Sequence, residues 1–154
     1  MITINQFMAD DHRRCDDLFI GAENAADQGD WASCARQFKE FADGMERHFR
    51  MEENVLFPVF EQHTGMTMGP TEVMRNEHAQ MRDVLKQLEQ AVEQKNQDAY
   101  LSYSETLLIL MQQHNLKEES VLYPMIDQSL NGNSQQIIGR MTAPDATGKA
   151  GDLR

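Results

Sequence analysis

The chain has 154 residues, of which 40% are hydrophobic and 25% charged, and its formal net charge is −11. These values are ordinary for one globular domain with a single core, and the acidic balance argues against nucleic acid or anionic membranes as partners. No run approaches the ~20 apolar residues of a membrane helix, and the N-terminus does not resemble a secretory leader. We therefore expect a cytoplasmic protein in which Cys15 and Cys34 are reduced thiols, with a disulfide between them as the alternative.

Four long helices are predicted in chain order. Their approximate ranges are 4–28, 31–63, 70–95 and 98–129. Gly29 ends the first helix, Asp30 can cap the second, Pro70 suits the first turn of the third, and Asn96 separates the third from the fourth. Short loops between helices of this length predict an all-α, up-down-up-down four-helix bundle.

The pattern weakens after the fourth helix, where Asn131, Gly132 and Asn133 stop it. Residues 134–141 can form one short helix, with Ile137 and Met141 on one side. Residues 142–154 are rich in Gly, Ala, Asp and Thr, which is typical of a flexible tail. We therefore predict the bundle over residues 1–130 and a short helix with a flexible tail over 131–154.

An internal repeat is the most informative feature of the sequence. Residues 48–58 read HFRMEENVLFP and residues 114–124 read HNLKEESVLYP, with six of eleven positions identical. The same offset of 66 residues carries His12 onto His78 and Asp11 onto Glu77. Four of the five histidines, and one glutamate from each copy, thus share one register.

Both copies of the repeat interrupt an apolar stripe with a polar pair. The stripe of the second helix is Phe38, Phe41, Met45, His48, Glu52, Val55, Leu56 and Val59. The stripe of the fourth is Leu107, Met111, His114, Glu118, Val121, Leu122 and Met125. Spacings of three and four residues predict that both stripes face the core. Pro58 and Pro124 are predicted to kink or end these helices at the same height.

A buried ionised carboxylate costs several kcal/mol unless it is paired, and neither stripe offers a Lys or Arg. Residues four apart on a helix point the same way, so each His–Glu pair can meet at a common point. Two divalent cations would supply the missing charge, with a carboxylate from each copy between them and two imidazoles on each. Imidazole and carboxylate without thiolate suit iron, manganese or zinc, with open positions for a small ligand. The alternatives are solvated i,i+4 pairs and an old duplication whose site is lost.

The series His, H-x-x-x-E, E-H and H-x-x-x-E resembles the hemerythrin-like (HHE cation-binding) domain family over about residues 5–130. The resemblance implies a four-helix bundle that holds two iron ions in a non-haem di-iron centre, with an oxo or hydroxo bridge and two bridging carboxylates. It also implies the metal ligands, which are the terminal residues His12, His48, His78 and His114 and the bridging residues Glu52 and Glu118.

One departure from the family pattern affects the expected function. Respiratory hemerythrins have a second histidine four residues after the one on the third helix, where this chain has Arg82. The resulting four-His, two-Glu set is similar to that of the di-iron iron-sulfur-cluster repair proteins, whose N-terminal cysteine-containing domain is not found here. We expect a protein that binds O2, NO or peroxide for oxygen or redox sensing, or that handles iron. The alternative is a di-iron enzyme or iron donor in NO or peroxide detoxification or cluster repair. We expect a monomer or weak homodimer.

Four further acids lie next to the expected ligands. Glu53 and Glu119 follow the two bridging glutamates, and we expect them to be solvated or to contact a ligand, although one of them can take an extra coordination position. Asp11 and Glu77 precede two of the histidines. The alternative to the solvent exposure that we expect is that these two acids accept hydrogen bonds from a neighbouring ligand.

Other side chains that could act near the site are Cys15, Tyr103, His63 and the methionines. Cys15 lies one turn after His12 and is expected to face inward, with a redox role as the less favoured interpretation. Tyr103 is expected to pack in the core rather than to act as a donor near the site. His63 has no counterpart in the repeat and is expected not to be a ligand. The eleven methionines are expected to fill the core.

Overall fold

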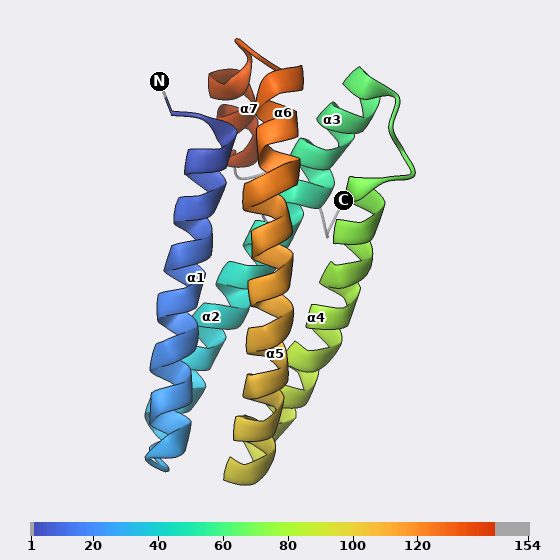
Figure 1. The fold of residues 1–154 in the computed structure, drawn as a ribbon. Helices are drawn as coiled ribbons and strands as arrows, with labels where there is room; N and C mark the ends of the chain where they lie inside the picture. Colours follow the sequence, from blue (N-terminus) through green and yellow to red (C-terminus); the bar gives the residue numbers. More distant parts are fainter. Residues whose placement is uncertain (1, 144–154) are drawn as a thin grey trace.

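A computed structural model describes residues 2–143. Helices joined by short loops make up this part of the chain, and it contains no strand. Figure 1 shows the long helices side by side, with shorter helices at one end. None of the described helices is long and apolar enough to cross a membrane. The flexible tail predicted over 142–154 lies, from residue 144 onward, outside the described residues.

The first two long helices begin as the sequence predicts. Helix α1 spans Ile4–Asp27 and starts with a capping box, in which the Thr3 hydroxyl accepts a hydrogen bond from the Gln6 backbone N–H. Gly29, at a φ of +72°, turns the chain after α1. Asp30 then caps α2 (Trp31–Met51) by accepting from the Ser33 N–H.

The other two long helices close the bundle. Helix α4 spans Pro70–Gln94 with its proline in the first turn, and Asn96 caps α5 (Gln97–Lys117) by accepting from the Ala99 N–H. Helix α1 packs against α2 and α5, and α4 packs against the same two helices. Each long helix therefore has two long neighbours, and all four surround a common interior.

The second and fourth helices, each predicted as a single helix over 31–63 and 98–129, are not continuous α-helices. Each contains one π-helical turn, η1 (Glu52–Leu56) and η2 (Glu118–Leu122), before continuing as α3 (Phe57–Thr64) and α6 (Tyr123–Ser129). The Phe57 and Tyr123 N–H groups donate to the carbonyls of Glu52 and Glu118, five residues back. Pro58 and Pro124, the next residues, have no N–H to donate. The disturbance predicted at these prolines therefore takes the form of a wide turn just before each of them.

The wide turns change which side chains are buried. Tyr123 and Phe57, which were not part of the predicted stripes, are fully buried. Val121, predicted to face the core, is 54% exposed, whereas its counterpart Val55 is buried. The difference arises because α7 (Ser134–Met141) packs against η1, where Ile137 joins the same apolar cluster as Val55.

The apolar core is divided into two clusters. One cluster fills the bundle between α1, α2, α4 and α5 and includes Phe41, Leu88 and Tyr100. The other lies around α3, α6 and α7 and includes Phe60 and Ile126. The predicted short helix over 134–141 is confirmed as α7. The polar residues of the repeat belong to neither cluster.

Candidate metal centre

The six predicted ligands meet inside the bundle, and each is at most 5% exposed. One histidine comes from each of α1, α2, α4 and α5, and the two glutamates are the first residues of η1 and η2. Two overlapping groups are close enough to share an ion: Glu52, His78, His114 and Glu118, and His12, His48 and Glu118. The structure therefore brings together all the residues that the repeat singles out.

Each of the two glutamates directs one oxygen toward each half of the cluster. In the His78/His114 half, Glu52 Oε1 lies 2.9 Å from His78 Nε2 and Glu118 Oε2 lies 3.2 Å from His114 Nε2. In the His12/His48 half, Glu118 Oε1 lies 3.0 Å from His12 Nε2 and Glu52 Oε2 lies 3.6 Å from His48 Nε2. This arrangement is the one that two bridging carboxylates require.

The outer nitrogen of every cluster histidine faces a carboxylate on a neighbouring helix. The Nδ1–carboxylate distances are 2.7 Å for His12–Glu119, 2.7 Å for His48–Asp11, 2.7 Å for His78–Glu53 and 2.8 Å for His114–Glu77. Donation of the Nδ1 proton to these acids leaves the Nε2 lone pairs directed inward, as in metal-binding histidines. All four contacts obey the 66-residue repeat.

The solvent exposure expected for Asp11 and Glu77 is therefore wrong. Their side chains are only 12% and 20% exposed, because each reaches across to the histidine of the next helix in the bundle. Glu53 and Glu119 also contact histidines, which was one of the expectations for them. The repeat of Asp11 as Glu77 was the signal in the sequence that identified this outer ring of acids.

The carboxylates give the interior a negative potential. Burial alone would lower the pKa of His114, but the nearby charge of Glu118 outweighs it and raises that pKa to about 9. Burial likewise opposes a raised pKa at His48, which Glu52 and Asp11 nevertheless raise well above its ordinary value. Burial would raise the pKa of Asp11, yet the hydrogen bond with His48 lowers it to about 2. The cluster favours bound positive charge.

Four atoms in the cluster also need a partner. Glu52 Oε1, His78 Nε2, His114 Nε2 and Glu118 Oε2 are buried and face one another in pairs, but no hydrogen bond of suitable geometry reaches them from the described part of the chain. An unsatisfied buried polar group costs about 1–3 kcal/mol, and more when it is charged. These are the very donor atoms that converge in the first group, so the residues present fit a bound cation.

Comparison with known families agrees with this geometry. Residues 3–126 match the family model of the hemerythrin HHE cation binding domain. The chain belongs to the hemerythrin HHE cation-binding domain family. Neither the comparison with curated proteins nor that with solved structures found a match. The resemblance predicted over about 5–130 is confirmed, and the clustered His and Glu residues of this HHE domain fit a metal site.

Arg82 supports the outer ring of this HHE domain. It follows His78 by one turn of α4, and its guanidinium donates to both oxygens of Glu53 at 2.9 and 3.0 Å. It also donates to both oxygens of Glu46 on α2 at 3.0 and 2.9 Å, and it lies over the ring of Phe49. At the position of the additional hemerythrin histidine, this chain thus has a cation that holds an outer acid in place.

Sequence reasoning missed Tyr123. Its hydroxyl lies 2.5 Å from Glu52 Oε2, 2.8 Å from Glu118 Oε1, and 3.3 Å from the Nε2 atoms of both His12 and His48. In the repeat it is only the near-equivalent of Phe57, and a continuous α-helix does not bring it to the cluster. The presence of a hydroxyl in one copy alone was the available signal.

A small enclosed cavity of about 10 Å³ adjoins the cluster. Apart from three of the cluster histidines and Asn115, its lining consists of Cys15, Met45, Phe49, Met81 and Met111. Cys15 therefore faces inward as expected, and burial raises the pKa of its thiol. Cys15 and Cys34 are both free thiols.

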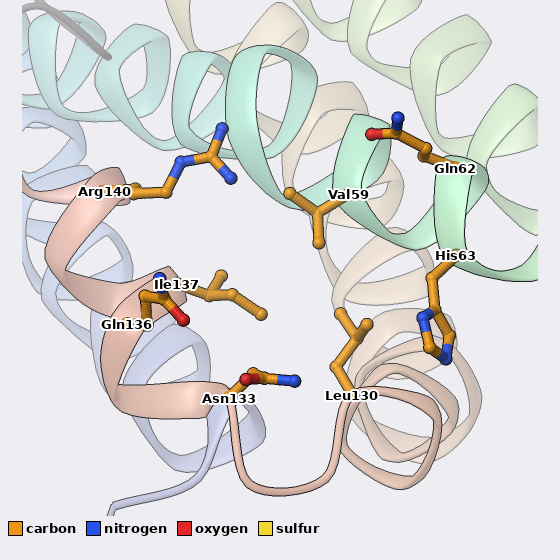
Figure 2. Close-up of a pocket in the computed structure, with 8 residues that line it drawn as sticks. All are labelled: Val59, Gln62, His63, Leu130, Asn133, Gln136, Ile137 and Arg140. Atoms are coloured by element: carbon orange, nitrogen blue, oxygen red, sulfur yellow. The ribbon is translucent and has the colours of Figure 1, made fainter.

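Two residues considered in the sequence lie away from the cluster. Tyr103 is 37% exposed, so the expected core packing is wrong: its position on α5 faces outward. His63 is exposed on α3 and belongs to neither metal-binding group found among the described residues. It lines a separate, open hollow of about 570 Å³ between α3, α6 and α7, together with Leu130 and Arg140 (Figure 2).

Proposed function

We propose that this HHE domain holds a non-haem di-iron centre. His12 and His48 bind one iron, His78 and His114 bind the other, and Glu52 and Glu118 bridge the two. The observation that carries the proposal is that both carboxylates direct one oxygen into each half. Two imidazoles with carboxylate oxygens are a donor set suited to iron(II) and leave positions for a further ligand.

The outer acids prepare the histidines for this role. Each carboxylate fixes the orientation of an imidazole ring and keeps its proton on Nδ1, so that Nε2 is free to bind a metal. The fixed rings come from four different helices, which means that metal binding connects the whole bundle. Metal binding is therefore expected to stabilise the fold as well as to serve function.

We propose a small molecule, O2, NO or peroxide, as the ligand, for oxygen or redox sensing or for iron handling. When bound, the irons supply redox chemistry and open coordination positions for that ligand. The chain supplies an enclosed cavity of about 10 Å³, the size of roughly one water-sized sphere. Thioether and phenyl groups line it beside three of the cluster histidines, and its small size favours a diatomic molecule over a larger substrate.

The second candidate is a di-iron enzyme or an iron donor that acts on NO, on peroxide or in iron-sulfur cluster repair. Arg82 favours it, because the side chain at this position holds Glu53 instead of presenting a fifth imidazole to the metal. The His78/His114 half then has only two imidazoles. That is the four-histidine set of the repair type rather than the set of the oxygen carriers.

Several broader expectations remain proposals. We propose that the long helices alternate up and down, that residues 1–130 form the bundle and 131–154 a C-terminal addition, and that the protein is a monomer or weak homodimer. We also propose a cytoplasmic location, with no nucleic-acid or membrane partner. The acidic net charge of −11 supports the absence of a nucleic-acid or membrane partner, and the two free thiols support the location.

Metal analysis of protein purified from iron-replete cells tests the proposal. We expect two irons per chain, and a visible spectrum that changes reversibly as O2 or NO is added and removed. Irreversible oxidation with turnover of NO or peroxide would favour the second candidate. Protein that contains no iron, and takes none up after chelation and reconstitution with iron(II), would overturn both.

A further inference from the structure

The hydroxyl of Tyr123 is surrounded by atoms of the proposed metal ligands. Tyr123 is fully buried, and the four hydrogen-bonding contacts of its hydroxyl are with Glu52, Glu118, His12 and His48. These residues form the His12/His48 half of the cluster together with both bridging carboxylates. We propose that Tyr123 is a seventh metal ligand, whose phenol oxygen binds the ion of the His12/His48 half. This inference rests on the proposed function.

The distances fit a donor that shares an ion with these four atoms. In an octahedral site with metal–ligand bonds of about 2.1 Å, neighbouring donors lie about 3.0 Å apart, and each donor has four such neighbours. The phenol oxygen has four neighbouring donor atoms, at 2.5, 2.8, 3.3 and 3.3 Å. The phenol oxygen therefore lies at about the distance from each of these atoms that separates neighbouring donors to one ion.

Hydrogen bonds alone explain the surroundings of the Tyr123 hydroxyl less well than a bound ion does. A phenol has one proton to donate, yet its oxygen approaches an oxygen of each carboxylate. The Nε2 atoms of His12 and His48 each lie 3.3 Å from the same phenol oxygen, while their Nδ1 atoms face Glu119 and Asp11. One phenol proton therefore serves three oxygen atoms, and a cation among them would remove the repulsion that is left. The displaced phenol proton leaves to solvent, as for other ligands that bind metals as anions.

The π-helical turn explains how Tyr123 reaches the site. In an α-helix, residues five apart point about 140° away from each other. In η2 the Tyr123 N–H instead bonds to the Glu118 carbonyl five residues back, so one wider turn separates the two residues. Tyr123 and Glu118 consequently lie on one face, where their oxygens are 2.8 Å apart.

Phe57 provides an internal comparison. Its ring stacks on His78 with centroids 5.9 Å apart, just as the ring of Tyr123 stacks on His12 at 5.7 Å. The two rings occupy equivalent places at the ends of η1 and η2, but only one carries an oxygen. The proposed ligand thus makes the two iron positions different: one gains a protein donor where the other has none.

The test uses the full chain loaded with iron(III) and resonance Raman spectroscopy in the visible region. We expect tyrosinate vibrations, enhanced through a tyrosinate-to-iron(III) charge-transfer band, and we expect Tyr123→Phe to abolish both. Tyr100→Phe is the matched control, because it removes the hydroxyl of another buried tyrosine, in the cluster below the site. This control is expected to keep the band and the vibrations.

Metal analysis of the same samples separates the possible failures. Wild-type protein with bound iron but no tyrosinate signal would overturn the ligand assignment alone and leave Tyr123 as a hydrogen-bond donor to the carboxylates. A signal that survives in Tyr123→Phe would also overturn it. Protein that binds no iron would overturn this inference and the proposed function together. The wild-type spectrum is decisive even if the phenylalanine variant fails to fold.

Discussion

The two halves of the metal cluster have the same inner plan. Each half contains two histidines from neighbouring helices, one oxygen of Glu52 and one oxygen of Glu118. An outer acid contacts the Nδ1 atom of each imidazole. An aromatic ring at the end of a π-helical turn stacks on one histidine of each half. The 66-residue repeat accounts for all of these common features.

The halves differ in what surrounds this plan. In the His78 half, Arg82 donates two hydrogen bonds to the outer acid Glu53. The equivalent position beside Glu119, in the His12 half, is Asp16. Burial, together with the charge of Glu119, raises the pKa of Asp16. One outer acid is thus paired with a cation and the other has an acid as its neighbour.

The two halves are most alike at the side chains that form the cluster and at the acids that contact them. The histidines, the bridging glutamates and the outer acids all have counterparts in the other copy, whereas Tyr123 is matched by Phe57 and Arg82 by Asp16. Two ions in such a site would have similar inner ligands and different surroundings.

Removing either bridging carboxylate should have the largest effect and should not distinguish the halves. Glu52→Ala and Glu118→Ala each take one oxygen from both halves, so each is expected to lose most of the bound metal. Metal content per chain after gel filtration measures this loss. Retention of two ions by one of the variants would show that its carboxylate does not bridge.

The meeting of the six inner residues was predictable because it depends on spacing alone. Residues four apart share a helix face, and a repeat places two such pairs at matching depth. The all-helical fold was predictable from local patterns as well, because helix caps such as Asp30 and Asn96 have signals in the sequence, and the structure confirms it.

The features that the sequence did not predict depend on rotation within or between helices. A proline in a helical pattern signals a disturbance but not its form, and here that form is a π-helical turn that buries Tyr123 and exposes Val121. The inward position of Asp11 depends on how α1 is rotated against α2, which no local pattern specifies. Tertiary packing decided these positions.

The outer acids should show the difference between the halves. Glu53→Gln and Glu119→Gln preserve size but weaken the acceptor of the Nδ1 proton, and loss of such a partner typically lowers metal affinity about 10–100-fold. We expect the larger loss for Glu53→Gln, because it also leaves the guanidinium of Arg82 without one of its two carboxylate partners. Chelator competition measures both affinities. Equal losses would mean that Arg82 contributes nothing to metal binding.

Replacing the neighbours of the outer acids should have smaller effects. Arg82→Met removes a partly exposed cation that links α2 and α4 through Glu46, and we expect metal-free protein to lose about 1 kcal/mol of unfolding free energy. Asp16→Asn should change it by less than about 0.5 kcal/mol, and in the stabilising direction, because burial of the Asp16 charge and its repulsion with Glu119 together outweigh its attraction to His12. Urea unfolding measures both, and a destabilising Asp16→Asn would contradict the described difference between the halves.

The smallest expected effect is that of His63→Ala, which should leave metal content and affinity unchanged. His63 is the one histidine outside the repeat, and it lies in the open hollow of Figure 2 rather than among the cluster residues. Among residues 2–143, no carboxylate contacts the His63 ring as the outer acids contact the Nδ1 atoms of the cluster histidines. His114→Ala, which removes an imidazole from the cluster, is the positive control and should lose metal. If His63→Ala also lost metal, burial within the repeat would no longer explain which histidines bind.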